Sequence, residues 1–108
     1  MSFSIAMQNI EIHVPSGSKG LDVVRAIDCS LAELDLHISL RGTLKKFPGC
    51  EHWHLRNTSQ SGTLELTFWP AQHRAWLTVQ SGRAAAWITD RLPEVRQTLD
   101  RHLAKLPK

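Results

Sequence analysis

Cysteine is scarce in this chain, with Cys29 and Cys50 the two among 108 residues. Two thiols cannot form the set of bridges that holds many small secreted proteins together. We therefore expect both thiols to be reduced and the protein to be cytoplasmic. The N-terminal residues also lack the basic start of a secretory signal, so we expect no signal peptide.

Long apolar runs are missing as well. A membrane-spanning helix needs about 18 or more consecutive apolar residues, and no stretch of this sequence approaches that length. The hydrophobic content of 42% is ordinary for a globular protein. We expect one domain over residues 1–108, built around one core and without a membrane partner.

Charge is distributed unevenly along the chain. Residues 1–40 hold two basic and five acidic side chains, a formal net charge of −3. Residues 41–108 hold eleven Lys or Arg against five Asp or Glu, a net charge of +6. This imbalance favours an anionic partner for the second part of the chain. The simpler interpretation is that Lys and Arg cover ordinary solvated surface.

Alternation of apolar and polar residues predicts three antiparallel strands between Pro48 and Val79. The predicted strands are His52–Asn57, Thr63–Trp69 and Arg74–Gln80, and the polar or Pro-containing segments between them predict hairpin loops. The short loops fix a register that places the apolar residues on one face. The expected opposite pairs are Leu55 with Leu64, Trp53 with Leu66, His54 with Glu65, Leu66 with Leu77, Phe68 with Ala75, Thr67 with Trp76, and Trp69 with Arg74.

Helical periodicity is clearest on the N-terminal side of these strands. Apolar residues at steps of three and four predict a helix over residues 18–41, closed by Gly42. The residues of this apolar face are Leu21, Val24, Ile27, Leu31, Leu34 and Ile38. A competing signal exists, because Leu34, Leu36, Ile38 and Leu40 also alternate like a strand. Charged residues over 22–35 favour the helix.

The C-terminal part predicts a second long helix over residues 90–106, with Pro93 in its first turn. Residues 81–88 fit a short helix better than a further hairpin strand, because Ser81 can cap a helix and three alanines follow Arg83. The strand interpretation stays open. Residues 43–49 are interpreted as a basic connector.

The resulting fold is α+β, with an antiparallel three- to four-stranded sheet and one face packed on two α-helices. Ile10–Val14 supplies the fourth strand. The predicted core consists of Leu21, Val24, Ile27, Leu31, Leu34, Trp53, Leu55, Leu64, Leu66, Phe68, Leu77, Val79, Leu99 and Leu103.

The opposite, outer face of the sheet is chemically unusual, because tryptophans stand there among basic residues and histidines. The candidate binding residues are His52, His54, Arg56, Glu65, Trp69, Arg74 and Trp76. Trp and Arg are favoured at interface centres, so the leading hypothesis is a non-enzymatic binding or assembly module whose partner is another protein or a second copy. Single-stranded nucleic acid is the alternative partner, because bases stack on aromatic side chains in basic grooves. The simplest interpretation is that the tryptophans shield the sheet, with Arg74 over Trp69 in a cation–π contact.

A metal-dependent enzyme is a further hypothesis. Cys50, His52 and His54 alternate along one strand with Glu65 opposite, and zinc accepts all three ligand types. The spacing permits a site without being a strong signature, and a His54–Glu65 contact on a solvated face explains the same residues. The leading hypothesis therefore includes no catalytic residue, no metal and no cofactor.

Some short patterns carry a resemblance. They are Pro48-Gly49, His52-Trp53-His54, Gly62-Thr63-Leu64-Glu65 with Thr67, Trp76, and Trp87-Ile88. Over roughly residues 42–90 the chain resembles a group of short bacterial proteins of unknown function. The resemblance implies a bacterial origin but no activity, cofactor or partner.

Overall fold

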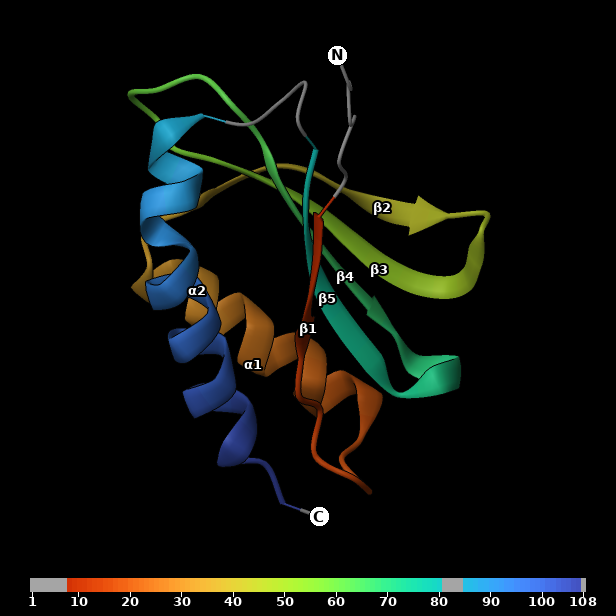
Figure 1. Cartoon of the computed structure of the whole chain (residues 1–108). Helices are drawn as coiled ribbons and strands as arrows, with labels where there is room; N and C mark the ends of the chain where they lie inside the picture. Colours follow the sequence, from red (N-terminus) through yellow and green to blue (C-terminus); the bar gives the residue numbers. More distant parts are fainter. Residues whose placement is uncertain (1–7, 81–84, 108) are drawn as a thin grey trace.

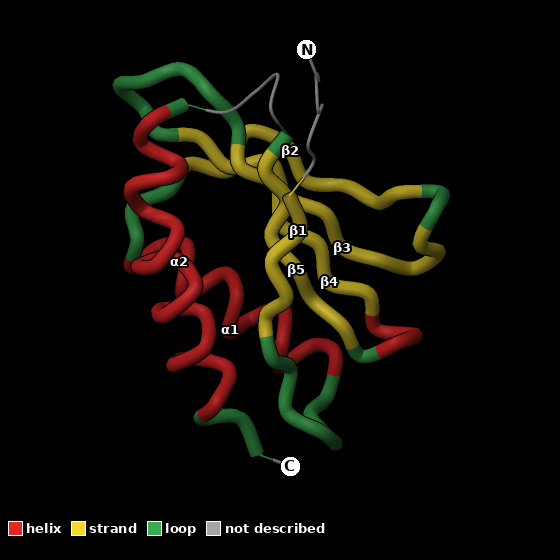
Figure 2. Tube along the Cα trace, in the orientation of Figure 1, coloured by secondary structure: helices red, strands yellow, loops and turns green. Residues whose placement is uncertain are grey.

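The computed structural model describes residues 8–80 and 85–107 (Figure 1). Within these residues, two helices cover one face of a five-stranded antiparallel sheet (Figure 2). The α+β prediction is confirmed, with one strand more than the three or four expected. The elements are β1 (Gln8–Ile12), α1 (Gly20–Glu33), β2 (His37–Leu44), β3 (Phe47–Arg56), β4 (Leu64–Trp69), the 3₁₀ turn η1 (Pro70–Gln72), β5 (Arg74–Val79) and α2 (Ala86–Ala104).

The strand order is β1-β5-β4-β3-β2, and the predicted register of the three central strands is confirmed. Trp53 lies opposite Leu66, and Leu66 lies opposite Leu77. β1 joins the sheet beside β5, two residues earlier in the chain than predicted. In the described part of the chain, neither helix is long and apolar enough to cross a membrane.

The core lies between the sheet and the two helices, and nearly all of its predicted residues are buried. Leu21 is the error, because 62% of it is exposed. The buried face of α1 instead contains Val23, Ile27 and Leu31, which turns Leu21 in the first turn towards solvent. Val24 is partly buried at the edge of this core.

The predicted helix over residues 18–41 is wrong in its second half. Helix α1 ends at Glu33, and Asp35 adopts a left-handed conformation with φ of 56°. The amides of Asp35 and Leu36 then donate to the carbonyls of Ala32 and Leu31, which is the Schellman arrangement of a helix C-terminus. A short polar residue such as Asp tolerates this conformation, so the chain turns here rather than at Gly42. The alternation after Leu34 is that of strand β2.

The segment interpreted as a basic connector, residues 43–49, is also part of the sheet. Leu44 pairs with Phe47, so Lys45 and Lys46 form the tight turn of a long β2–β3 hairpin. Two register shifts interrupt the β2–β3 ladder, and bulges of this kind bend a strand pair. Figure 1 shows this hairpin extending on the side of the sheet away from the helices.

The C-terminal helix starts earlier than predicted. Helix α2 begins at Ala86 and continues through Pro93, which lies inside the helix rather than in its first turn. Trp87 and Ile88 are buried, and the Trp87 indole donates to the carbonyl of Ser61 at 2.8 Å. The burial of these two side chains explains the early start. The helix prediction therefore holds over residues 86–88, whereas residues 81–84 lie outside the described part of the chain.

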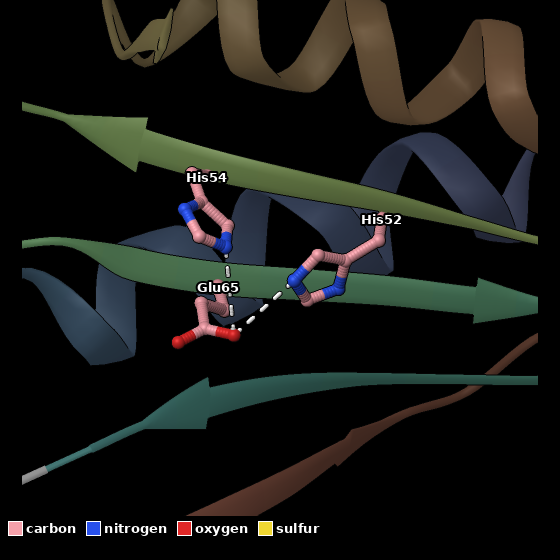
Figure 3. A group of neighbouring side chains, drawn as sticks. All are labelled: His52, His54 and Glu65. Carbon is pink, nitrogen blue, oxygen red and sulfur yellow. Dashed lines mark ion pairs between the residues drawn. The ribbon is translucent and has the colours of Figure 1, made fainter. Parts of the chain in front are cut away.

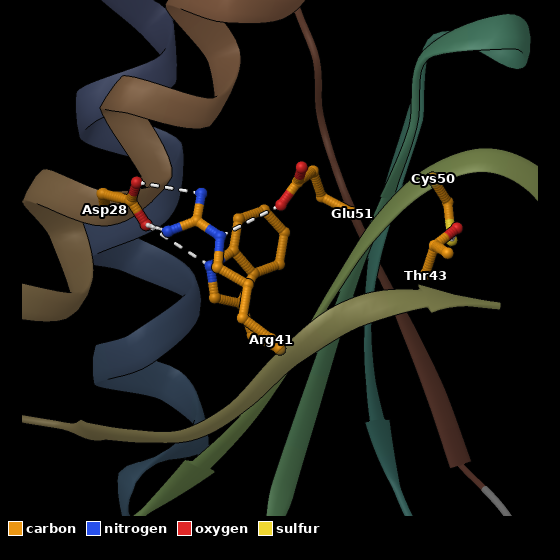
Figure 4. A network of polar contacts seen from close by, with 6 residues as sticks. Asp28, Arg41, Thr43, Cys50 and Glu51 are labelled. Atoms are coloured by element: carbon orange, nitrogen blue, oxygen red, sulfur yellow. Dashed lines mark hydrogen bonds and ion pairs between the residues drawn. The ribbon is translucent and has the colours of Figure 1, made fainter.

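A polar network fastens α1 to the hairpin (Figure 4). The Arg41 guanidinium donates twice to Asp28 on α1, at 3.2 Å each, and once to Glu51 at 3.0 Å. Asp28 also accepts a hydrogen bond from the indole of Trp53 at 3.3 Å. Burial lowers the pKa of Arg41, but the hydrogen bonds with Glu51 and Asp28 outweigh it and leave the pKa raised. Arg41 therefore stays charged and holds helix and hairpin together.

Candidate binding pocket on the outer sheet face

The outer face of the sheet is not an open surface. All five residues of β4 from Leu64 to Phe68 are buried, although a strand points its side chains alternately to both faces. The helices cover one face. On the other face, the β2–β3 hairpin continues beyond the end of β4 and brings Phe47 over the sheet.

Phe47 packs on both tryptophans of the outer face. Its ring centroid lies 5.0 Å from that of Trp69 and 4.9 Å from that of Trp76. Trp76 is only 6% exposed, and Trp69 is half-buried with its indole donating to the carbonyl of Pro48 at 3.1 Å. Both tryptophans lie on the outer face as predicted, and the hairpin of the chain itself covers them, which favours the simplest interpretation of these residues.

A cavity of about 250 Å³ lies on this face beside the aromatic cluster. Its lining combines the two hairpin strands with the outer positions of β1, β3, β4 and β5. The lining residues are Asn9, Leu44, Lys46, Phe47, His52, Glu65, Thr67, Trp76, Thr78 and Gln80. We call this cavity the outer-face pocket.

His52, His54 and Glu65 meet at this pocket (Figure 3). The Nε2 atoms of His52 and His54 lie 3.2 Å and 3.7 Å from the same carboxylate oxygen, Oε1 of Glu65. The side chains of His52 and Glu65 are 5% and 8% exposed, whereas that of His54 is 21% exposed. The predicted pair of His54 and Glu65 is thus present. The imidazole of His52 joins this pair, and the cluster is largely buried.

Two further side chains orient this cluster. The Thr67 hydroxyl lies 2.8 Å from Nδ1 of His52, so Nε2 of His52 is turned towards Glu65. The Gln80 amide donates to Oε2 of Glu65 at 2.6 Å, which leaves Oε1 facing the imidazoles. Thr67 therefore holds His52 in place, and Gln80 holds Glu65.

Cys50 does not share this cluster. Its Sγ lies 3.3 Å from the amide nitrogen of Leu44 and 3.7 Å from the hydroxyl of Thr43 (Figure 4). Among the described residues, the group of potential metal-ligand atoms here consists of His52, His54 and Glu65. The structure thus reduces the four-residue set of the metalloenzyme hypothesis to three.

The two candidate arginines occupy different places. Arg74 stacks over Trp76, with its guanidinium carbon 5.0 Å from the ring centroid, and forms an ion pair with Glu11. The hydrogen bond to Glu11 raises the pKa of Arg74. Arg56 is exposed at the far end of β3, beside a separate surface hollow lined by His37 and Ser39. Arg74 therefore belongs to the surroundings of the pocket, and Arg56 does not.

No known protein family, curated protein or solved structure matches this chain.

Sequence reasoning did not single out Thr67, Gln80 and Phe47 among the residues of the pocket. Thr67 occupies an outer position of β4 and Gln80 directly follows β5, so strand alternation places them on the correct face without showing what they bind. The sequence around Phe47 does not indicate its role. Phe47 pairs with Leu44 near the tip of the hairpin, but its ring packs on Trp69 and Trp76. Its role depends on the bend of the hairpin, which alternation does not encode.

Proposed function

We propose that this protein is a non-enzymatic binding module that holds a small ligand in the outer-face pocket. The observation that carries the proposal is the set of polar side chains buried beside the cavity, above all His52 and Glu65. Both side chains are paired, His52 with Thr67 and Glu65 with Gln80, so their burial alone needs no ligand. Their convergence at the edge of a cavity with aromatic walls is the pattern typical of a ligand site.

The composition and size of the pocket support a small occupant. Aromatic rings of Phe47 and Trp76 form part of its lining, while His52, Glu65 and Lys46 supply polar contacts. Pockets that combine apolar walls with a few convergent polar groups are typical ligand sites. Since one water occupies about 30 Å³ of liquid, a cavity of about 250 Å³ suits an ion with its waters or a small organic molecule.

The larger partners expected from the sequence gain less support. Assembly with a protein or a second copy depends on apolar rings available for burial, and nucleic-acid binding depends on rings available for stacking. Phe47 already packs on Trp69 and Trp76. A small ligand inside the pocket needs no exposed ring.

A catalytic role has weak support. The Thr67 hydroxyl and the His52 imidazole are as close as a nucleophile and its general base would be. However, Thr67 is 1% exposed, so its oxygen is poorly placed to reach a substrate. Orientation of His52 is the role that this contact supports.

Probe titrations test the proposal. Metal-free protein labelled with ¹⁵N would be titrated with acetate, benzoate, inorganic phosphate and ethanolamine, each alone and each with one equivalent of Zn²⁺. We expect at least one probe, at millimolar concentration, to shift the backbone amides of Thr67, Trp76 and Thr78. The tryptophan fluorescence of the chain, to which Trp76 contributes, should change with the same dependence on concentration.

A matched pair of hairpin variants controls for indirect effects. Phe47→Ala removes an aromatic side chain that lines the pocket and should abolish or strongly weaken probe binding. Leu40→Ala changes an exposed position on the same hairpin and should leave binding unchanged. Circular dichroism would show that both variants are folded. If neither a probe, with or without Zn²⁺, nor Zn²⁺ alone shifts the pocket amides, the proposed function is wrong.

A further inference from the structure

We infer that His52, His54 and Glu65 together bind one divalent transition-metal ion of the zinc class. This inference rests on the proposed function, because it names the ion as the ligand of the pocket or as the anchor of a small molecule there. The three residues are brought together by adjacent strands β3 and β4 rather than by a flexible loop, so the donor set is preorganised.

The donor atoms are close to the arrangement that a metal ion needs. The potential ligand atoms of all three residues lie within 4.8 Å of one another. Donors about 2.0–2.2 Å from a tetrahedral zinc ion are separated by roughly 3.3–3.6 Å. The distances from Glu65 to His52 and His54, 3.2 Å and 3.7 Å, already match this separation.

The chemistry of the donors selects the kind of ion. Two imidazoles with one carboxylate suit zinc and its neighbours among the transition metals, whereas magnesium and calcium prefer oxygen ligands. Three protein ligands also leave at least one coordination position open, as in zinc sites that hold a water or a substrate. His52 and Glu65 line the outer-face pocket, so an open position there would face its contents.

The neighbours of the cluster match the usual support of a metal site. Metal-binding histidines commonly use their second ring nitrogen in a hydrogen bond, and ligating carboxylates are themselves hydrogen-bonded. Thr67 satisfies the first condition at His52, and Gln80 satisfies the second at Glu65. A divalent ion with one carboxylate keeps a net positive charge. With Lys46 in the same lining, the open position favours water or a small anionic group.

Calorimetry with Zn²⁺ on untagged, chelator-treated protein tests the site. We expect the chain to bind one ion. The affinity should fall by more than about 100-fold in His54→Gln and in Glu65→Gln, because loss of a residue that only supports a ligand costs about 10- to 100-fold. Thr67→Val should fall within that smaller range. His37→Gln is the matched control, because it removes an exposed histidine outside the cluster and should bind as the unaltered chain does.

Cobalt provides a second readout. The visible absorption of bound Co²⁺ reports its ligands, so His54→Gln should alter the spectrum and His37→Gln should not. If Glu65→Gln fails to fold, His54→Gln still decides the question, because its side chain is the most exposed of the three. Absence of stoichiometric Zn²⁺ and Co²⁺ binding by the folded chain, or binding unaffected by both cluster variants, would overturn the metal site.

The probe titrations separate the two proposals. If acetate, benzoate, phosphate or ethanolamine occupies the pocket of metal-free protein while Zn²⁺ does not bind, the metal inference is wrong and the proposed function stands. If neither the ions nor the probes bind, both are wrong.

Discussion

Leu66 is fully buried in the centre of the sheet, between Trp53 on β3 and Leu77 on β5. Leu66→Ala removes apolar contacts on both sides and leaves a cavity. We expect the free energy of unfolding to fall by about 2–5 kcal/mol, measured by urea denaturation.

Leu21→Ala is the matched control, because it makes the same chemical change at an exposed position. Surface substitutions of this kind usually change stability by less than about 0.5 kcal/mol. Equal costs for the two variants would contradict the assignment of Leu66 to the core and of Leu21 to the surface.

At the level of elements, Asp28 connects α1 to the sheet through two partners. It pairs with Arg41 on β2 and accepts the indole N–H of Trp53, which is fully buried. Asp28→Ala leaves that donor without its acceptor, so we expect a loss of about 1–3 kcal/mol in thermal or urea unfolding.

Asp28→Asn separates the two contributions. The Asn side-chain oxygen can still accept from Trp53, whereas the charge opposite Arg41 and one of the two hydrogen bonds from Arg41 are lost. Since partly exposed ion pairs contribute about 0–1 kcal/mol, this variant should cost less than Asp28→Ala. A loss as large as that of the alanine variant would show that charge, and not the indole hydrogen bond, fastens the helix.

A second contact joins the two helices and depends on pH. Glu33 on α1 accepts from Arg101 and from His102 on α2, and these hydrogen bonds lower the pKa of Glu33. A carboxyl that is more acidic in the folded protein stabilises fully above the unfolded value of about 4.3 and loses this effect as pH falls through its folded pKa.

Urea midpoints of the unaltered chain and of Glu33→Gln test this dependence. We expect the unaltered chain to be more stable near neutral pH, and the difference to disappear as pH falls below about 4. A difference that stays constant over this range would show that the charge of Glu33 makes no contribution.

Strand β2 shows why one element escaped sequence prediction. Leu34 and Ile38 fit both a helical step of four and a strand step of two, so periodicity alone could not separate the two structures. The deciding feature is the left-handed conformation of Asp35, which stops the helix. Asp tolerates that conformation without requiring it, and its position in the sequence therefore gives no clear stop signal.

At the scale of the whole molecule, local patterns predicted the centre of the sheet and missed what covers it. Alternation and short loops fixed the pairing of His54 with Glu65 correctly. They could not show the pocket beside this pair, because Phe47 and Glu65 line the same cavity only through the bend of a long hairpin. The face was predictable from sequence, whereas the pocket depends on tertiary structure.

The pairing of β1 with β5 has a consequence for the order in which the protein can form during synthesis. Strands β2 to β5 follow one another as hairpins, but Gln8 pairs with Val79, far along the chain. On the ribosome, β1 must wait without its partner until β5 emerges, and closing so long a loop is entropically costly. The wall of the pocket that contains Asn9 is therefore completed only after β5 is made.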